Sequence, residues 1–171
     1  FNGNLLYHGC IPTKEDGSFD DVYIDGQYLS GMKYLKQVED KVRKAFYCEV
    51  GSEEQLNALD YCWYLWSGPK SPLFGKNKMT TFERYFIEEY CKSILKEFGL
   101  DVDKSHIVNG HVPVKTHKGE SPIKGEGILL VIDGGLSKAY HKNTGIGGYT
   151  LISNSNVMII AEHRPFAEVV E

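Results

Sequence analysis

The sequence predicts an α+β protein in which most helices precede most strands. Helical patterns with capping residues fill much of the region between residues 30 and 99, and β-rich runs separated by glycine-containing turns dominate the remainder. One further apolar run stands near the start of the chain. This order favours a sheet with helices on one side. The length of 171 residues suits one domain, so residues 1–171 are expected to fold as a single domain.

The first expected element is a buried strand. The run from Asn4 to His8 is short and apolar, and it ends at Gly9, which fits a strand that stops at a sharp turn. A polar loop over residues 13–18 follows. Residues 22–24 then predict a brief strand or arm.

A helix is expected to begin after Ser30, which can serve as its N-cap. Apolar residues recur at every third or fourth position and predict one buried face: Leu35, Val38, Val42, Ala45 and Phe46.

A second helix begins at Ser52, because Gln55 three residues later completes a capping box, and it stops at Gly68. Residues 70–78 are expected to form an exposed loop. Thr80 with Glu83 marks a third helix that runs over residues 80–98 and ends at a glycine. The apolar stripe of the second helix consists of Leu56, Leu59, Trp63 and Trp66.

The later part of the chain predicts strands. β-rich runs occupy residues 107–108, 128–132, 149–152 and 157–161, with glycine-containing turns between them. The loops between these strands are the expected place for a functional site, because binding and catalytic residues concentrate on loops held by a rigid scaffold.

Charge and cysteine content exclude several classes of protein. Lysine and arginine total 19 and aspartate and glutamate total 23, so the net charge of −4 argues against a nucleic-acid binder. No apolar run approaches the length of a membrane span. The four cysteines form no CxxC pair, so free thiols in a cytoplasmic protein are expected. The chain opens without Met on an apolar segment, which indicates a piece of a longer protein.

Two histidines are the strongest candidates for a functional site. His8 and His111 each adjoin a glycine and follow an apolar strand, so both are expected at the crevice beyond the strand ends. Two neutral imidazoles brought together there would suit a divalent transition metal. The alternative is a pair of structural histidines bonded to backbone carbonyls. Among the others, His106 is expected to be buried, and His117 and His141 to lie in exposed loops.

Several cations could contact a phosphate. Arg84 offers a fork that matches phosphate bidentately, and Lys115 and Lys124 flank a polar segment just after the second candidate histidine. Lys138 follows Asp133-Gly134-Gly135, which is either a substrate-facing turn or a plain tight turn. For the lysines at 70, 76 and 78, solubility is an equally ordinary role. The aromatic helix residues could form a sugar platform, although core packing or a domain contact is favoured: Tyr61, Trp63, Tyr64 and Trp66.

Several longer motifs carry a resemblance to a known family. They are Leu-Leu-Tyr-His-Gly-Cys-Ile-Pro (5–12), Trp-Ser-Gly-Pro-Lys-Ser-Pro-Leu-Phe-Gly-Lys (66–76), Met-Thr-Thr-Phe-Glu-Arg-Tyr-Phe (79–86), Asn-Gly-His-Val-Pro-Val-Lys (109–115), Gly-Glu-Ser-Pro-Ile-Lys (119–124) and Val-Ile-Asp-Gly-Gly-Leu-Ser-Lys-Ala-Tyr (131–140). With residues 144–151, they make nearly the whole chain resemble the C-terminal half of the class III fructose-1,6-bisphosphatases of Firmicutes-type and related bacteria.

The resemblance implies a fold and a metal centre. That family belongs to the calcineurin-like metallophosphoesterases, whose core is a β-sandwich flanked by helices, so this chain would be its C-terminal half with a mostly antiparallel or mixed sheet. His8 and His111 look like two of the family's metal-ligating histidines. The implied cofactor is a pair of Mn²⁺ or Mg²⁺ ions, whose other ligands would come from residues that this chain lacks.

Three departures from the family pattern stand out. Pro113 occupies the place of a second histidine in the late Gly-His-x-His motif of many superfamily members. The protein-phosphatase branch also has a single histidine in this motif. The early motifs that would supply the other metal ligands and the catalytic acid are missing. Family members also carry a longer polar stretch between Ile87 and Cys91.

The implied function is that of an enzyme. The whole protein would hydrolyse the 1-phosphate of fructose 1,6-bisphosphate in gluconeogenesis, and this chain alone would be inactive. Another calcineurin-like phosphoesterase, such as a phosphoprotein phosphatase, is the second hypothesis, and a non-catalytic binding or assembly module is the third. The expected partners are fructose 1,6-bisphosphate and the missing N-terminal half, and an apolar sheet edge predicts self-association.

Overall fold

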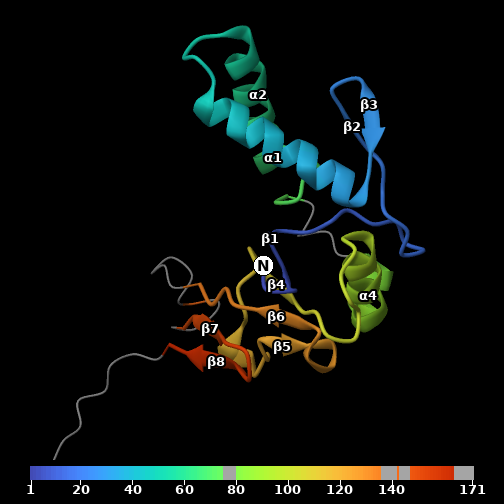
Figure 1. Ribbon diagram of the computed structural model, residues 1–171, viewed down its shortest axis with the longest axis vertical. Coiled ribbons are helices and arrows are strands. Elements are labelled where there is room, and N and C mark those ends of the chain that lie inside the picture. Colours follow the sequence, from blue (N-terminus) through green and yellow to red (C-terminus); the bar gives the residue numbers. More distant parts are fainter. Residues whose placement is uncertain (75–79, 136–141, 143–146, 164–171) are drawn as a thin grey trace, which may run out of the picture.

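The computed structural model describes residues 1–74, 80–135, 142 and 147–163 of the chain. A four-stranded sheet forms the lower part of the molecule, and a pair of helices rises above one edge of that sheet (Figure 1). The expectation of an α+β protein is confirmed at this level.

The sheet is mixed and contains three parallel strands. Its order is β1 (Leu5–His8), β4 (Ile107–Gly110), β6 (Leu129–Val131) and β5 (Ile123–Lys124). β1, β4 and β6 are parallel, and only β5 is antiparallel to its neighbour. Of the two sheet types that the resemblance implies, mostly antiparallel or mixed, the mixed one is therefore confirmed for this sheet. Two further antiparallel pairs form separate hairpins, β2 (Val22–Ile24) with β3 (Gln27–Leu29) and β7 (Tyr149–Ser153) with β8 (Met158–Glu162).

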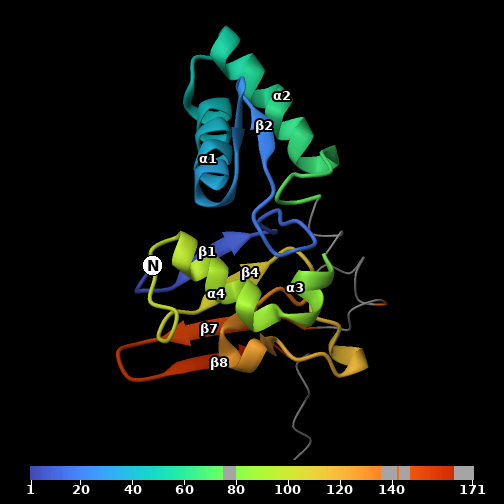
Figure 2. The same cartoon turned by 90° about the vertical axis from the view of Figure 1, so that its right-hand side faces the viewer.

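One helix covers one face of the sheet. α4 (Ile87–Glu97) lies across β1 and β4 (Figure 2). Its Tyr90, Cys91, Ile94 and Leu95 are buried against strand residues such as Ile107 and Val131. Apolar side chains at this spacing on a helix form the stripe that a sheet face can bury. The prediction that helices cover one side of the sheet is thus confirmed for α4. The two remaining long helices, over residues 31–47 and 53–67, instead lie beyond the edge strand β1.

The expected third helix is divided in two. Thr80 caps it as predicted, since its Oγ1 accepts a hydrogen bond from the backbone N–H of Glu83 at 3.1 Å. α3 (Thr81–Tyr85) then ends, and Phe86, with φ −122° and ψ 51°, leaves the helical conformation before α4 begins. A single helix over residues 80–98 is therefore wrong. The C-terminal end is as predicted, because Gly99 adopts φ +68° and Leu100 N–H bonds back to Leu95 O at 2.9 Å.

α1 (Gly31–Tyr47) and α2 (Glu53–Ser67) pack on each other to form the helical arm, residues 31–67. Tyr34 is fully buried at the base of this arm, and its hydroxyl contacts Tyr61 Oη and Lys70 O, each at 3.2 Å. The Ser52 cap is confirmed, because its Oγ accepts from Gln55 N–H at 3.2 Å. Ser30 lies at the N-cap position of α1 but makes no side-chain cap bond.

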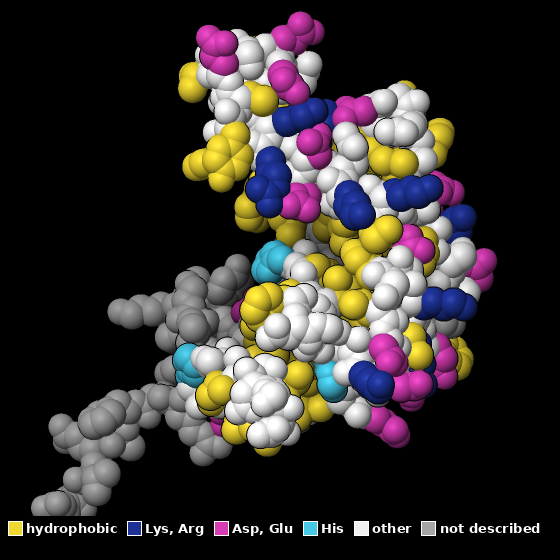
Figure 3. Space-filling model, viewed as in Figure 1, with side chains coloured by type: hydrophobic (Ala, Val, Ile, Leu, Met, Phe, Trp, Pro, Cys, Tyr) yellow, Lys and Arg dark blue, Asp and Glu magenta, His cyan; other side chains and the backbone are white. Residues whose placement is uncertain are grey.

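The apolar stripe of α2 is exposed rather than buried. Leu56, Leu59, Trp63 and Trp66 are between 42% and 76% exposed, and Val42 and Phe46 of α1 are also exposed. Figure 3 accordingly shows exposed hydrophobic side chains on the left of the upper, helical part. The prediction that this stripe packs into the core is therefore wrong within this chain. The residues that α2 buries are instead Ala58 and Leu65.

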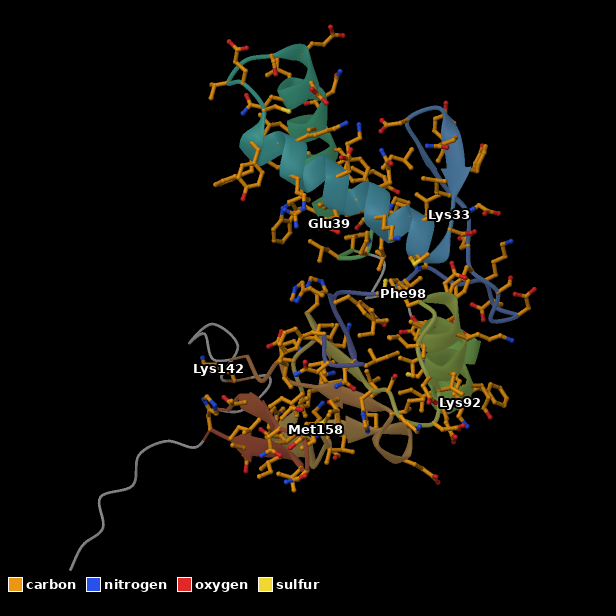
Figure 4. All side chains as sticks on the ribbon, viewed as in Figure 1. Lys33, Glu39, Lys92, Phe98, Lys142 and Met158 are labelled. Atoms are coloured by element: carbon orange, nitrogen blue, oxygen red, sulfur yellow. The ribbon has the colours of Figure 1, made fainter. Side chains whose placement is uncertain are left out.

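An apolar pocket of about 390 Å³ separates the arm from the sheet. Leu6 and Tyr7 of β1 line one side, and Leu35 of α1 and Phe98 at the end of α4 line the other. Figure 4 labels Phe98 and Glu39, which both border this pocket. Among the described helices, none has the length and apolar character of a membrane span. The four cysteines form no disulfide with one another, as expected.

Candidate metal and phosphate site

The ends of two neighbouring parallel strands bring the two candidate histidines together. β1 and β4 pair in a register that places His8 opposite Gly110, and His111 follows directly. Nδ1 of His111 lies 3.1 Å from Nε2 of His8, and the ring centroids are 4.9 Å apart in an edge-to-face arrangement. The convergence predicted from the two glycine motifs is confirmed.

Two glycines make this approach possible. Gly9 turns the chain directly after His8 with φ +94°, and a Cβ there would lie 2.2 Å from Pro72 O. At Gly110 a Cβ would lie 3.3 Å from Nδ1 of His8. Each glycine therefore leaves space that a side chain would fill.

The backbone of His111 is held in an unusual conformation. Its φ is +86°, a region that non-glycine residues seldom adopt. Its N–H donates to Oδ2 of Asp133 at 3.2 Å, and Oδ1 of the same carboxylate accepts from Gly135 N–H at 3.0 Å. Asp133 thus forms a tight turn, which is one of the two roles predicted for residues 133–135, and it also fixes the backbone of His111.

The histidine pair presents two neighbouring ring nitrogens that could bind a metal ion, Nε2 of His8 and Nδ1 of His111. Among residues 1–74, 80–135, 142 and 147–163, no group of three or more His, Cys, Asp and Glu side chains is arranged to hold a metal ion. The pair is therefore a partial ligand set within the described chain. Chemically it can share a hydrogen bond between its rings or donate two imidazole nitrogens to a divalent ion.

Three of the four predicted phosphate-binding residues lie around one pocket. Arg84, Lys115 and Lys124 line a pocket of about 320 Å³ between α4 and the C-terminal end of the sheet. Its remaining wall is largely apolar, with Ile87, Val112, Leu129 and Val131 among the lining residues. The fourth predicted residue, Lys138, lies outside the described residues.

A half-buried acid organises the cationic side of this pocket. Oε1 of Glu120 lies 2.5 Å from Nζ of Lys124, and Oε2 accepts from the backbone N–H of Lys115 at 2.9 Å. Burial alone would raise the pKa of Glu120, but these two interactions outweigh it and hold the pKa below its ordinary value. Arg84 and Lys115 carry their charges on exposed side chains, so an anion can reach both.

Two tyrosines, Tyr7 and Tyr90, also line this pocket. Burial raises the pKa of the Tyr7 hydroxyl and of the Tyr90 hydroxyl well above the usual value, so both are neutral. The Tyr90 hydroxyl donates to Ile11 O at 3.3 Å. These phenols were missed by sequence analysis, since at helical and strand spacing they resemble ordinary core residues.

Other candidates from the sequence have structural roles or lie outside the described chain. Lys70 pairs with Asp20 at 3.0 Å, which supports its ordinary surface role. Lys76, Lys78 and His141 are outside the described residues. His106, which was expected to be buried, is only half-buried and lies close to Asn4. His117 is exposed, as expected.

Asn109 is a site residue that sequence analysis did not single out. It is 2% exposed, and its Nδ2 donates to Tyr7 O and Gly9 O, each at 3.0 Å. The available signal was an amide in an otherwise apolar strand, directly before Gly110.

Comparison with known proteins identifies close relatives over the whole chain. The family model described as "Firmicute fructose-1,6-bisphosphatase" matches residues 1–90 and 88–171. The class 3 fructose-1,6-bisphosphatase of Clostridium novyi (strain NT) is 50% identical over 188 residues, covering 99% of this chain and 28% of the relative. That of Clostridium botulinum (strain Alaska E43 / Type E3) is 48% identical, covering 100% of this chain and 29% of the relative. No solved structure matches the chain.

Two features of these matches bear on the structure. The chain spans less than a third of the length of the relatives. The 188 aligned positions also exceed the 171 residues of this chain, so the relatives carry residues that it lacks. The two matched segments of the family model meet at residues 88–90, at the start of α4, which is where the longer polar stretch of family members is expected.

Proposed function

Since this chain belongs to the Firmicute fructose-1,6-bisphosphatase family, we propose that it is the C-terminal part of the catalytic region of a metal-dependent sugar-phosphate phosphatase. The whole protein hydrolyses the 1-phosphate of fructose 1,6-bisphosphate to give fructose 6-phosphate. The observation that carries this proposal is the convergence of His8 and His111 at the ends of two parallel strands. The implied fold is the C-terminal half of a calcineurin-like sandwich.

The histidine pair fits a divalent metal in its donor chemistry and spacing. Two nitrogens that bind one ion at about 2.1 Å lie roughly 3.0 to 3.4 Å apart. The nitrogens of His8 and His111 are 3.1 Å apart. Imidazole nitrogens bind divalent transition ions, so the pair can serve Mn²⁺ alongside the oxygen ligands that this ion prefers, whereas Mg²⁺ would depend on oxygen ligands from elsewhere in the protein. When bound, a two-metal centre would supply charge neutralisation and an activated water for phosphate ester hydrolysis.

The pocket beside the strand ends supplies the substrate contacts of this chain. Arg84 and Lys115 would bind a phosphate group of the sugar bisphosphate, with Arg84 able to donate two parallel hydrogen bonds. Lys124 would act together with Glu120, which holds it in place. Lys138 belongs to the same proposal through its position after the Asp133 turn in the sequence.

The remaining ligands belong to the rest of the full-length protein. Two imidazoles leave most of an ion's coordination to water, and a two-metal reaction needs two ions within about 4 Å of each other. This chain by itself is therefore inactive. The full-length protein is the form in which the proposal is tested.

The test compares metal content and turnover in three full-length variants. His8→Ala and His111→Ala should each lose bound Mn²⁺ and hydrolysis of fructose 1,6-bisphosphate. His106→Ala is the matched control, because His106 lies at the opposite end of β4 from His111. A full-length protein that prefers a phosphopeptide over the sugar bisphosphate would instead be a phosphoprotein phosphatase. Unchanged metal content and turnover in both site variants would leave only the non-catalytic binding or assembly module.

A further inference from the structure

We propose that Asn109 is a positioning residue that holds His8 and His111 in register for metal binding. This inference rests on the proposed function, because it concerns the ligands of the proposed metal. Asn109 touches neither ring in the contacts described above. It acts through the backbone of the strand that carries His8 and through its own place two residues before His111.

The first step of the argument is the pair of hydrogen bonds that Asn109 makes. Its Nδ2 donates to Tyr7 O and to Gly9 O, each at 3.0 Å. These two carbonyls lie on either side of His8 in the sequence. Both N–H bonds of the amide are therefore used to fix the backbone immediately before and after the histidine.

The orientation of this amide follows from its partners. Tyr7 O and Gly9 O are acceptors only, so the group that faces them must be the NH₂ and not the carbonyl oxygen. An exchanged amide would set oxygen against two oxygens. The assignment of donor and acceptor therefore does not depend on hydrogen positions.

The second step is the place of Asn109 in the sheet. It pairs with Tyr7 in β1 and with Val131 in β6, so it lies in the central parallel strands. The next pair of the ladder, His8 with Gly110, is the last one between β1 and β4. Asn109 thus joins the two strands at the point where both leave the sheet and the two histidines begin.

The third step is the unpaired oxygen of the same side chain. Asn109 Oδ1 is buried and has no hydrogen-bond partner among the described residues. Burying an unpaired acceptor is unfavourable, so an asparagine whose only role was to stabilise the strands would be expected to satisfy both ends. Retaining the amide here fits a requirement for its two donors.

The neighbouring residues complete the arrangement. Gly110 leaves space for the His8 ring, and Asp133 binds the backbone N–H of His111. Asn109 fixes the other histidine. Each ring is thereby oriented through its own backbone, as partners outside the ligand set commonly do in metal sites.

The experiment measures Mn²⁺ affinity in the full-length protein by titration followed by electron paramagnetic resonance. Asn109→Ala should raise the dissociation constant roughly 10- to 100-fold. Asn109→Ser can donate only one hydrogen bond and should give a smaller increase. It also keeps the test open if the alanine variant does not fold. Thermal unfolding of each variant is recorded alongside.

Asn4→Ala provides the matched control. The Asn4 side chain also joins β1 to β4, since its Oδ1 accepts from His106 N–H at 2.9 Å, but it does so at the opposite end of the strands. This variant should lose stability without a change in Mn²⁺ affinity. If Asn4→Ala weakens Mn²⁺ binding as much as Asn109→Ala, the effect is general strand destabilisation and the positioning role is wrong.

His8→Ala separates failure of this inference from failure of the proposed function. If His8→Ala weakens Mn²⁺ binding and both Asn109 variants leave it unchanged, only the positioning role is overturned. If His8→Ala also leaves the affinity unchanged, the metal proposal fails and the positioning role fails with it.

Discussion

At the scale of single residues, the histidine site depends on two short glycine motifs. His8-Gly9 and Gly110-His111 turn the chain at the ends of adjacent strands, and the turns direct both rings to one place. Sequence analysis could find these motifs because a histidine beside a glycine after an apolar run has a recognisable pattern. It did not single out Asn109, because an amide in an apolar strand reveals its role only when its two carbonyl partners are known.

Gly110→Ala in the full-length protein is expected to weaken Mn²⁺ binding. The added Cβ would lie 3.3 Å from Nδ1 of His8, so the ring has to move. Calorimetric titration with MnCl₂ measures the change. Gly147→Ala is the control, since a Cβ there meets nothing closer than 3.7 Å. An unchanged affinity in Gly110→Ala would show that the ring position is unimportant for the metal.

Glu120 makes stability depend on pH at the pocket. Its pKa in the folded protein is held below the ordinary value of a glutamate side chain, because the interactions with Lys124 and Lys115 outweigh burial. A carboxyl group with a lowered folded pKa stabilises the fold above its unfolded pKa, and this contribution is lost as pH falls through the folded pKa. The stability difference between wild type and Glu120→Gln should therefore shrink at acidic pH. Urea unfolding at about pH 7 and about pH 3 measures it, and a constant difference would contradict it.

At the scale of helices and strands, local sequence signals located most elements but not their surroundings. Ser52 and Thr80 both cap helices as predicted. The break at Phe86 was missed, because nothing in the sequence there resembles a helix terminator such as glycine or proline. The stripe on α2 was correctly seen as apolar, yet periodicity states only that a face is apolar and not what covers it.

Tyr34 is expected to hold the helical arm together at its base. Its hydroxyl donates to Lys70 O and also bonds to Tyr61 Oη, while burial raises the pKa of Tyr61 to about 12. Tyr34→Phe removes both bonds and should lower the free energy of unfolding by about 1 to 2 kcal/mol. Chemical denaturation measures the loss. Tyr23→Phe is the control, since Tyr23 is 62% exposed, and an equal loss in both variants would contradict this role.

At the scale of the whole molecule, the pocket is a product of topology. Arg84 lies in α3, Lys115 follows β4 and Lys124 lies in β5, and the fold brings the three to one pocket. Sequence analysis could propose Arg84 for its guanidinium group and the two lysines for their place after a histidine motif. It could not place them together, because their separation along the chain is bridged only by the packing of α4 on the sheet.

The isolated 171-residue chain is expected to self-associate. Leu6 on the edge strand β1 and the α2 residues Trp63 and Trp66 are more than half exposed, and exposed apolar surfaces of this kind promote association. Sedimentation velocity over a range of concentrations measures it, and Trp63→Lys with Trp66→Lys should shift the chain toward monomer. A strictly monomeric wild-type chain at high concentration would contradict the expectation.

The central claim is that His8 and His111 bind the same divalent ion in the full-length protein. Crystals of that protein grown with Mn²⁺, measured at the manganese absorption edge, test it most directly. The account predicts an anomalous peak about 2.1 Å from one ring nitrogen of each histidine. A manganese peak at other residues of the protein, with His8 and His111 still hydrogen-bonded to each other, would contradict it.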